Sequence, residues 1–232
     1  LLVQIDRDAP TDKYQWSYCK DAISGMKELF ATMSFDEKKD NIGYVIVDMF
    51  GESTYQEFST ALNDLESKGM KSLIIDLRGN SGGYLSTAYE LADLFIEKGK
   101  NIYQMKDKNN EVTISKAEND IYRHFDKISV VINQNRASAS EILAGSVKDL
   151  KAGKVIGTQT FGKGIMQSYI ELENGGGVAI TIAKYYTASG NEIHGVGIEP
   201  DIKVELPKGT TIDYKVNPNT DLQLKEAINA LK

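Results

Sequence analysis

The chain has 232 residues, 41% of them hydrophobic and 26% charged, which are the proportions of an ordinary globular protein. This length allows one large domain, or one domain with a small appendage. The net charge of −6 argues against a sequence-independent nucleic-acid binder, which would carry a basic stripe. There is no run of about 18 apolar residues, so no segment is expected to span a membrane.

The sequence contains few residues that could bind a zinc ion or form a disulfide. Cys19 is the only cysteine, which rules out an internal disulfide. With only His124 and His194 to join it, a zinc site of the Cys/His type is not expected.

The first 41 residues are polar apart from one helix-like stretch between about positions 15 and 33. Apolar residues recur in that stretch every three or four positions, which predicts an amphipathic helix. These residues are Trp16, Cys19, Ile23, Met26 and Phe30.

From Gly43 the pattern changes to strands that alternate with helices. The expected strands are residues 44–50, 72–77 and 128–133, with another beginning at 101. The expected helices are residues 53–67, 85–96 and 139–150. Short, continuously apolar strands such as 72–77 are typical of a parallel sheet that is buried on both faces. The order therefore predicts an α/β core with largely parallel strands.

After Lys154 the sequence becomes rich in strands. Residues 154–160, 165–173 and 177–187 are strand-like, and the last two flank Asn174-Gly175-Gly176, a hairpin signal. A helix is expected from about 221 to 231, with Thr220 as its N-cap. The α/β core is thus expected to carry a β-rich extension.

Ser81 is the first candidate nucleophile. It lies in GNSGG (79–83), which fits the G-x-S-x-G pattern between a strand and a helix. A hydrolase of the esterase type would then need His124 or His194 as its base, and there is no HGGG-like segment upstream. The same glycine-rich turn has another use, because its backbone N–H groups can stabilise an anion or a developing oxyanion.

Ser138 is the second candidate. It follows the strand 128–133 and opens a helix, and SASE fits a capping box in which Glu141 reaches back. A purely structural, helix-capping serine therefore explains the pattern as well. However, a serine at this position lies among free N–H donors, and the N–H of Ala139 would point near an oxyanion formed there. Ser140 is the rival within the motif.

Lys163 lies in FGKG, 25 positions after Ser138. Phe161, Ile165 and Met166 are apolar neighbours that would desolvate its ammonium group, and burial lowers a lysine pKa enough for work as a general base. In a strand, Gln167 would share a face with Lys163, so that its neutral amide could orient the amine. The alternative is a solvated loop charge.

Several spaced motifs resemble the C-terminal processing proteases, the tail-specific serine endopeptidases of the S41 type. The similarity runs in collinear order from about Gly43 to Pro207. Its motifs are DLRGNSGG (76–83), ELADLF (90–95), RASASEILAG (136–145), GTQTFGKGIMQS (157–168) and AITIAKYYTASGNEIHGVGIEPDI (179–202).

The resemblance implies a fold related to the crotonase and Clp protease cores, with a Ser–Lys dyad. Ser138 would be the nucleophile, Lys163 the general base and Gln167 the residue that orients the lysine. The N–H groups of Ala139 and Gly83, and less surely Gly82, would form the oxyanion hole. Ser81 would then be a turn residue, and no cofactor or metal would be required.

The resemblance also implies three parts: an N-terminal helical segment (1–42), a peptidase core (43–207) and a C-terminal helical tail that packs on the core (208–232). Expected partners are proteins or peptides with exposed C-terminal tails, and a homo-oligomer is allowed. The expected location is extracytoplasmic, in the periplasm, the cell envelope or the secreted fraction.

Two features depart from the family pattern. Relatives usually carry a PDZ domain before the first core strand, and residues 1–42 are too few to hold one, which leaves substrate gating open. Arg136 stands where a small residue is frequent, close to Ser138. A catalytically idle binding or scaffold homologue therefore remains an alternative to the Ser–Lys peptidase.

Overall fold

The computed structural model describes residues 2–5, 41–120, 123–135, 137–171, 177–207, 209–210 and 220–232. The helix expected over 15–33, the turn at 174–176 and Arg136 lie outside these residues.

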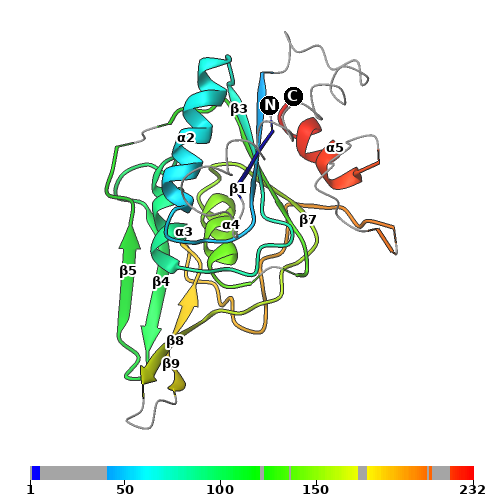
Figure 1. The fold of residues 1–232 in the computed structure, drawn as a ribbon. Helices are drawn as coiled ribbons and strands as arrows, with labels where there is room; N and C mark the ends of the chain where they lie inside the picture. Colours follow the sequence, from blue (N-terminus) through cyan, green and yellow to red (C-terminus); the bar gives the residue numbers. More distant parts are fainter. Residues whose placement is uncertain are drawn as a thin grey trace.

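A six-stranded, fully parallel sheet forms the centre of the molecule, with the order β1-β2-β3-β6-β7-β10 (Figure 1). Its strands are β1 (Leu2–Ile5), β2 (Ile42–Val47), β3 (Ser72–Asp76), β6 (Ile128–Ile132), β7 (Lys154–Gly157) and β10 (Ile202–Lys203). The parallel α/β core predicted from the buried strands is confirmed. β1 was not expected, because its pairing with β2 is made between segments far apart in the sequence.

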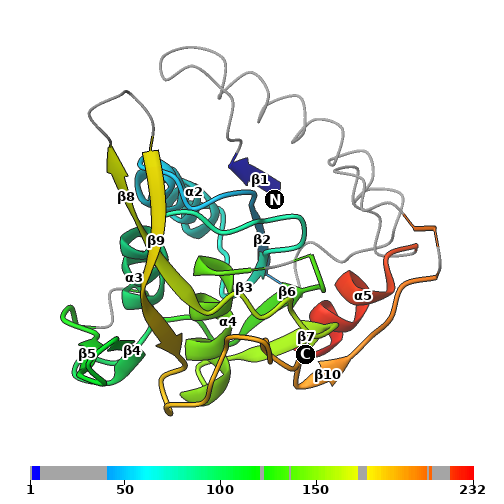
Figure 2. The ribbon, with the colours of Figure 1, turned by 90° about the horizontal axis from the view of Figure 1, so that it is seen from below.

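Helices cover both faces of this sheet, as Figures 1 and 2 show. On one face lie α2 (Thr54–Ser67), α3 (Leu85–Asp93) and α4 (Ala139–Asp149), and on the other lies α5 (Leu222–Asn229). Successive strand residues point to opposite faces, so Val45 and Ile75 pack in the first core while Tyr44 and Ile74 pack towards α5. Burial on both faces explains why these strands are apolar without alternation.

A second sheet is antiparallel and has the order β5-β4-β9-β8. Its strands are β4 (Asn101–Asp107), β5 (Val112–Lys116), β8 (Ile165–Glu171) and β9 (Gly177–Tyr186). It confirms the expected β-rich extension. β5 was missed, because most of its residues are exposed and it lacks a buried apolar face.

The start of α5 differs from the prediction. Asp221 is the N-cap, and its Oδ1 accepts a hydrogen bond from the Leu224 N–H at 3.0 Å, so Thr220 lies one residue outside the cap. Aspartate and threonine are both good caps, and the local pattern could not separate neighbouring candidates.

A buried polar network fastens α5 to the end of β3. Arg78 pairs with Asp76 at 2.6 Å and with Asp221 at 2.7 Å, and it donates to Gln223 Oε1 at 3.2 Å. Burial alone would lower the pKa of Arg78, but Asp76 and the other acidic neighbours raise it overall. Burial, together with Asp76, raises the pKa of Tyr44, whose hydroxyl donates to that carboxylate at 2.5 Å. The C-terminal helix is thus tied to the segment that leads into GNSGG.

None of the helices in the described part of the chain is both long and apolar enough to cross a membrane.

Candidate active site

The sheet topology brings the three sequence motifs to one edge. β3, β6 and β7 are parallel neighbours, and their carboxyl ends lead into GNSGG, the Ser138 turn and the Lys163 loop respectively. Parallel strands place their carboxyl ends at the same edge, which is where sites form in α/β folds.

The GNSGG turn lies directly against Ser138. A Cβ atom built on Gly82 would be 2.9 Å from Ser138 Cβ and 3.0 Å from the Ala137 carbonyl oxygen. The φ of Gly82 is also +106°, a value that favours glycine. Only a glycine allows the two turns to approach this closely.

Asn80 shapes that turn from inside the protein. Its Nδ2 donates to the Val47 carbonyl oxygen at 2.7 Å, and its Oδ1 accepts from the Gly82 N–H at 2.8 Å. The N–H of Gly82 is therefore in use. Gly83 lies against the backbone of Phe50, and its own N–H has no acceptor among the described residues.

Ser138 has a strained backbone, with φ 61° and ψ −120°. A non-glycine residue at such angles costs about 1–3 kcal/mol, and these conformations cluster at functional sites. The strain sets Ser138 on a sharp turn at the first residue before α4. Among the described residues, the N–H of the adjacent Ala139 has no acceptor.

Ser138 and Glu141 form the capping box that the S-x-x-E spacing predicts. The Ser138 N–H donates to Glu141 Oε2 at 2.8 Å. The Glu141 N–H lies against the Ser138 side chain and donates to the Ser138 carbonyl oxygen at 2.9 Å. The rival Ser140 is fully buried, with its hydroxyl 3.4 Å from the Asn80 carbonyl oxygen.

Glu141 joins the Ser138 turn to the Lys163 loop. Its side chain is 0% exposed and accepts four hydrogen bonds. Besides the Ser138 N–H, the donors are the Lys163 N–H (2.9 Å), the Gly162 N–H (2.7 Å) and the Thr160 hydroxyl (2.5 Å). One carboxylate thus holds the backbones of both candidate residues.

The rest of the Lys163 loop is held from the other side. Thr160 Oγ1 accepts from the Ile198 N–H at 2.7 Å, and Gly162 accepts from the Gly195 N–H at 2.9 Å through its carbonyl oxygen. Residues 195–198 and Glu141 of α4 thus hold the loop from two separate segments, and none of these bonds involves the side chain at position 163.

The expected burial of Lys163 is wrong in this structure. Its side chain is exposed, and Phe161, which was expected to desolvate it, is itself 69% exposed. Between these two residues, no hydrogen bond joins the Ser138 hydroxyl to the Lys163 amine in this structure. Catalytic hydrogen bonds are often long or absent before a substrate is bound.

The prediction that Gln167 shares a strand face with Lys163 rested on both residues lying in one regular strand. Lys163 precedes β8, which begins at Ile165, and a register irregularity lies between Met166 and Gln167. Simple alternation along a strand therefore does not put Lys163 and Gln167 on one face. The Gln167 side chain is exposed and has no hydrogen bond to a described residue, so its role stays a prediction.

Ser81 lacks the features seen at Ser138. It is exposed, and it is not among the described non-glycine residues with positive φ. His124 and His194 are both exposed, and neither side chain has a hydrogen bond or ion pair with any described residue. Within the described ranges, no three His, Cys, Asp or Glu side chains are placed to hold a metal ion.

Replacing Glu141 by glutamine is expected to destabilise the protein by about 2–3 kcal/mol. The amide keeps the shape but supplies one acceptor oxygen instead of two, so at least one buried backbone N–H at Gly162, Lys163 or Ser138 loses its acceptor. Urea unfolding measures the change. Glu90→Gln, at an exposed position of α3, is the matched control and should change the stability by less than about 0.5 kcal/mol. Equal stability of the two variants would contradict the prediction.

Sequence reasoning missed the roles of Asn80, Thr160 and, in part, Glu141. The S-x-x-E spacing pointed to the local bond between Glu141 and the Ser138 N–H. The bonds to Thr160, Gly162 and Lys163 join residues 19 to 22 positions apart and leave no local signal.

The sequence is similar to that of known proteins. Residues 41–204 match peptidase family S41. A carboxy-terminal processing protease, CtpA, of Bacillus subtilis is 41% identical over 184 residues, covering 79% of this chain and 39% of that protein. A probable CtpA-like serine protease of Staphylococcus haemolyticus is 36% identical over 193 residues, with the same two coverages. The chain thus spans about two-fifths of the length of these curated relatives.

Solved structures agree in fold. The photosystem II D1 C-terminal processing protease superposes with a TM-score of 0.65 and 32% identity, covering 81% of this chain and 45% of that one. A putative peptidase of Parabacteroides merdae, 22% identical with a TM-score of 0.62, covers 96% of this chain and 76% of its own and shows the same fold. The family match covers more than half of the sequence, and the chain therefore belongs to peptidase family S41.

Proposed function

We propose that this chain contains the catalytic core of a serine endopeptidase with a Ser–Lys dyad, in which Ser138 is the nucleophile and Lys163 the general base. The observation that carries the proposal is the strained backbone of Ser138 beside the N–H groups of Gly83 and Ala139, which have no acceptor among the described residues. A helix-capping serine does not need this strain. A nucleophile benefits from it, because the sharp turn places its oxygen next to donors for an oxyanion.

The N–H groups of Gly83 and Ala139 are the proposed oxyanion hole. Gly82 is left out, because its N–H already donates to Asn80 Oδ1. Preorganised N–H donors of this kind stabilise the charge that develops in the transition state, and one such donor is worth about 10²–10³-fold in rate.

In the proposed reaction, the neutral amine of Lys163 takes the proton from the Ser138 hydroxyl as the oxygen attacks the substrate carbonyl carbon. Gly83 and Ala139 then hold the tetrahedral oxyanion, and Lys163 returns the proton to the leaving amine. A water molecule, deprotonated by the same lysine, releases the acyl group from Ser138. Bound substrate would cover Lys163 and exclude water from it, which favours its neutral form. Gln167 would orient the amine in that complex.

The substrates we propose are unstructured or partly folded proteins, cleaved near their C-termini. The support comes from the family and from relatives whose names state carboxy-terminal processing. An extracytoplasmic location and a homo-oligomeric assembly are proposed on the same resemblance. No described feature favours the alternative with Ser81 and a histidine.

Labelling with a serine-reactive fluorophosphonate tests the proposal. The probe should attach to Ser138 in the folded protein, and peptide mass mapping should find little label on Ser81 or Ser140. An unfolded protein substrate, incubated in parallel, should be cleaved, and prior labelling should stop the cleavage.

Two other outcomes would each refute the proposal. Label on Ser81 together with loss of cleavage would favour the esterase-type alternative. A folded protein that neither reacts with the probe nor cleaves any unfolded substrate would be a catalytically idle homologue.

A further inference from the structure

Asn80 is a buried polar residue in the middle of the GNSGG turn, and the reaction proposed above gives it no role. It is 0% exposed, and both polar atoms of its side chain are bonded: Nδ2 donates to the Val47 carbonyl oxygen and Oδ1 accepts from the Gly82 N–H. The Ser140 hydroxyl donates to the Asn80 carbonyl oxygen at 3.4 Å. Asn80 therefore joins the last residue of β2, its own turn and the first turn of α4.

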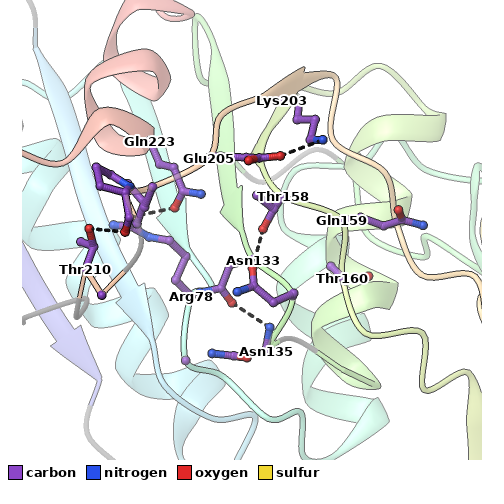
Figure 3. Close-up of a pocket in the computed structure, with 15 residues that line it drawn as sticks. Arg78, Asn133, Asn135, Thr158, Gln159, Thr160, Lys203, Glu205, Thr210 and Gln223 are labelled. Carbon is purple, nitrogen blue, oxygen red and sulfur yellow. Dashed lines mark hydrogen bonds and ion pairs between the residues drawn. The ribbon is translucent and has the colours of Figure 1, made fainter.

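Asn80 is not placed to bind a ligand itself. The two residues before it, Arg78 and Gly79, line a cavity of about 940 Å³ at the carboxyl edge of the parallel sheet (Figure 3). Asn80 is not among the described residues that line this cavity, and its side chain is directed to the end of β2 instead. Any effect of this side chain on catalysis therefore acts through the backbone of the turn.

The turn needs a group that selects its conformation. Gly82 and Gly83 have φ values of +106° and +137°, and a glycine backbone can adopt many other conformations at little cost. The bond from the Gly82 N–H to Asn80 Oδ1 closes an Asx turn, in which a side-chain oxygen takes the place of a backbone carbonyl. This bond turns the Gly82 N–H towards the inside of the protein.

The contacts of Phe50 direct the next N–H group. The Phe50 N–H donates to the Gly82 carbonyl oxygen at 3.0 Å, and the Tyr84 N–H donates to the Phe50 carbonyl oxygen at 2.7 Å. A trans peptide bond joins Gly82 to Gly83, and in such a bond the C=O and the N–H point in opposite directions. Because the C=O points to Phe50, the Gly83 N–H points away from Phe50.

The position of this peptide group matters because the Ser138 turn lies against it. A Cβ atom built on Gly82 would be 2.9 Å from Ser138 Cβ and 3.5 Å from the Ala139 nitrogen. A rotation of the peptide between Gly82 and Gly83 would therefore move one proposed oxyanion donor relative to the other, which is the Ala139 N–H. An oxyanion hole requires both donors to be aimed at one point before the reaction begins.

We propose that Asn80 is a positioning residue for the oxyanion hole. Its amide holds the Gly82 N–H inward and anchors the turn to β2, so that the Gly83 N–H is presented to the substrate carbonyl oxygen under attack. An amide suits this place, because one planar group supplies a donor for Val47 and an acceptor for Gly82. This inference rests on the proposed peptidase function and adds to it the residue that sets the direction of an oxyanion donor.

Two pairs of variants isolate the bond to Gly82. Asn80→Ser keeps an oxygen that can accept from the Gly82 N–H in a turn of the same kind, whereas Asn80→Ala has no such oxygen. Asn80→Thr and Asn80→Val repeat the comparison with larger side chains, which leave a smaller cavity. Ser129→Ala is the control, because it removes a different buried hydrogen bond, from Ser129 near the start of β6 to the Ala227 carbonyl oxygen.

The values of kcat and KM are measured on an unstructured peptide, at a temperature where far-UV circular dichroism shows each variant to be folded. In Asn80→Ala and Asn80→Val, kcat should fall by about 10²-fold with little change in KM, because the lost interaction is made only in the transition state. Asn80→Ser and Asn80→Thr should each be about tenfold faster than the paired variant without the hydroxyl, because weaker turns of the same kind remain. Ser129→Ala should keep kcat within about threefold of the wild-type value.

Ser138→Ala separates the two hypotheses. If the wild-type protein cleaves the peptide no better than Ser138→Ala, both the peptidase function and the role of Asn80 are overturned. If cleavage depends on Ser138 but the folded Asn80→Ala and Asn80→Val variants keep the kcat of Ser129→Ala, the role of Asn80 alone is wrong. Equal losses of kcat in both members of each pair would also overturn it, because the bond to Gly82 would then have no effect.

Discussion

Replacing Ser138 by alanine is expected to lower peptide-bond cleavage by about 10⁴–10⁶-fold, the loss that follows removal of a serine nucleophile. The fold should be retained, because the backbone N–H that donates to Glu141 is still present. Initial rates on an unfolded protein substrate measure the effect. Ser81→Ala is the matched control and should keep activity within about a few fold, since Ser81 is an exposed turn residue. A large loss of activity in Ser81→Ala with none in Ser138→Ala would instead identify Ser81 as the nucleophile.

Ser138→Gly tests the backbone strain at the same position through its effect on protein stability. Glycine adopts φ 61° without a steric penalty, so this variant should be more stable than the wild-type protein by about 1 kcal/mol while being equally inactive. Ser138→Ala retains a Cβ and should show no such gain. Urea unfolding compares the three proteins. A capping serine would give the opposite result, because its loss destabilises a helix.

Replacing Lys163 by arginine is expected to lower the rate by about 10³-fold or more, and Lys163→Ala is expected to have the same effect. Arginine keeps the positive charge but cannot be deprotonated in proteins, so it cannot act as the base. Neither variant should change the stability by more than about 0.5 kcal/mol, because Lys163 is exposed and only its backbone is held by Glu141. If Lys163→Arg retained most of the activity, the lysine would serve only as a charge.

The double variant Ser138→Ala/Lys163→Ala tests whether the two residues act as a unit. It should be no less active than Ser138→Ala alone, because a base has no role without its nucleophile.

Local patterns predicted most of the fold. The strands at 72–77 and 128–133 and the helices at 53–67 and 139–150 were placed to within a residue or so, because burial on both sheet faces or on one helix face leaves a direct apolar signature. β5 has no buried apolar face, and β1 lies in a parallel pair whose partner is distant in the sequence. The periodicity of apolar residues therefore could not predict β1 or β5.

The sequence predicted which segments meet at the candidate site but not the contacts between them. Ser138 and Lys163 lie in the segments that follow β6 and β7, and the carboxyl ends of neighbouring parallel strands meet at one edge of a sheet. The exposure of the Lys163 side chain could not be predicted in this way. The apolar residues around Lys163 suggested a buried amine, but the loop turns Phe161 outward, and no local pattern reports the direction of a loop side chain.

By itself, the sequence determined the α/β class, the order of most strands along the chain and the spaced motifs of family S41. Those properties depend on residue type and spacing, which a sequence contains. The tertiary structure decided that Asn80 takes up the N–H of Gly82 and that Glu141 holds both loops. Each of these depends on a hydrogen bond made, or left unmade, between groups that meet only when the chain is folded.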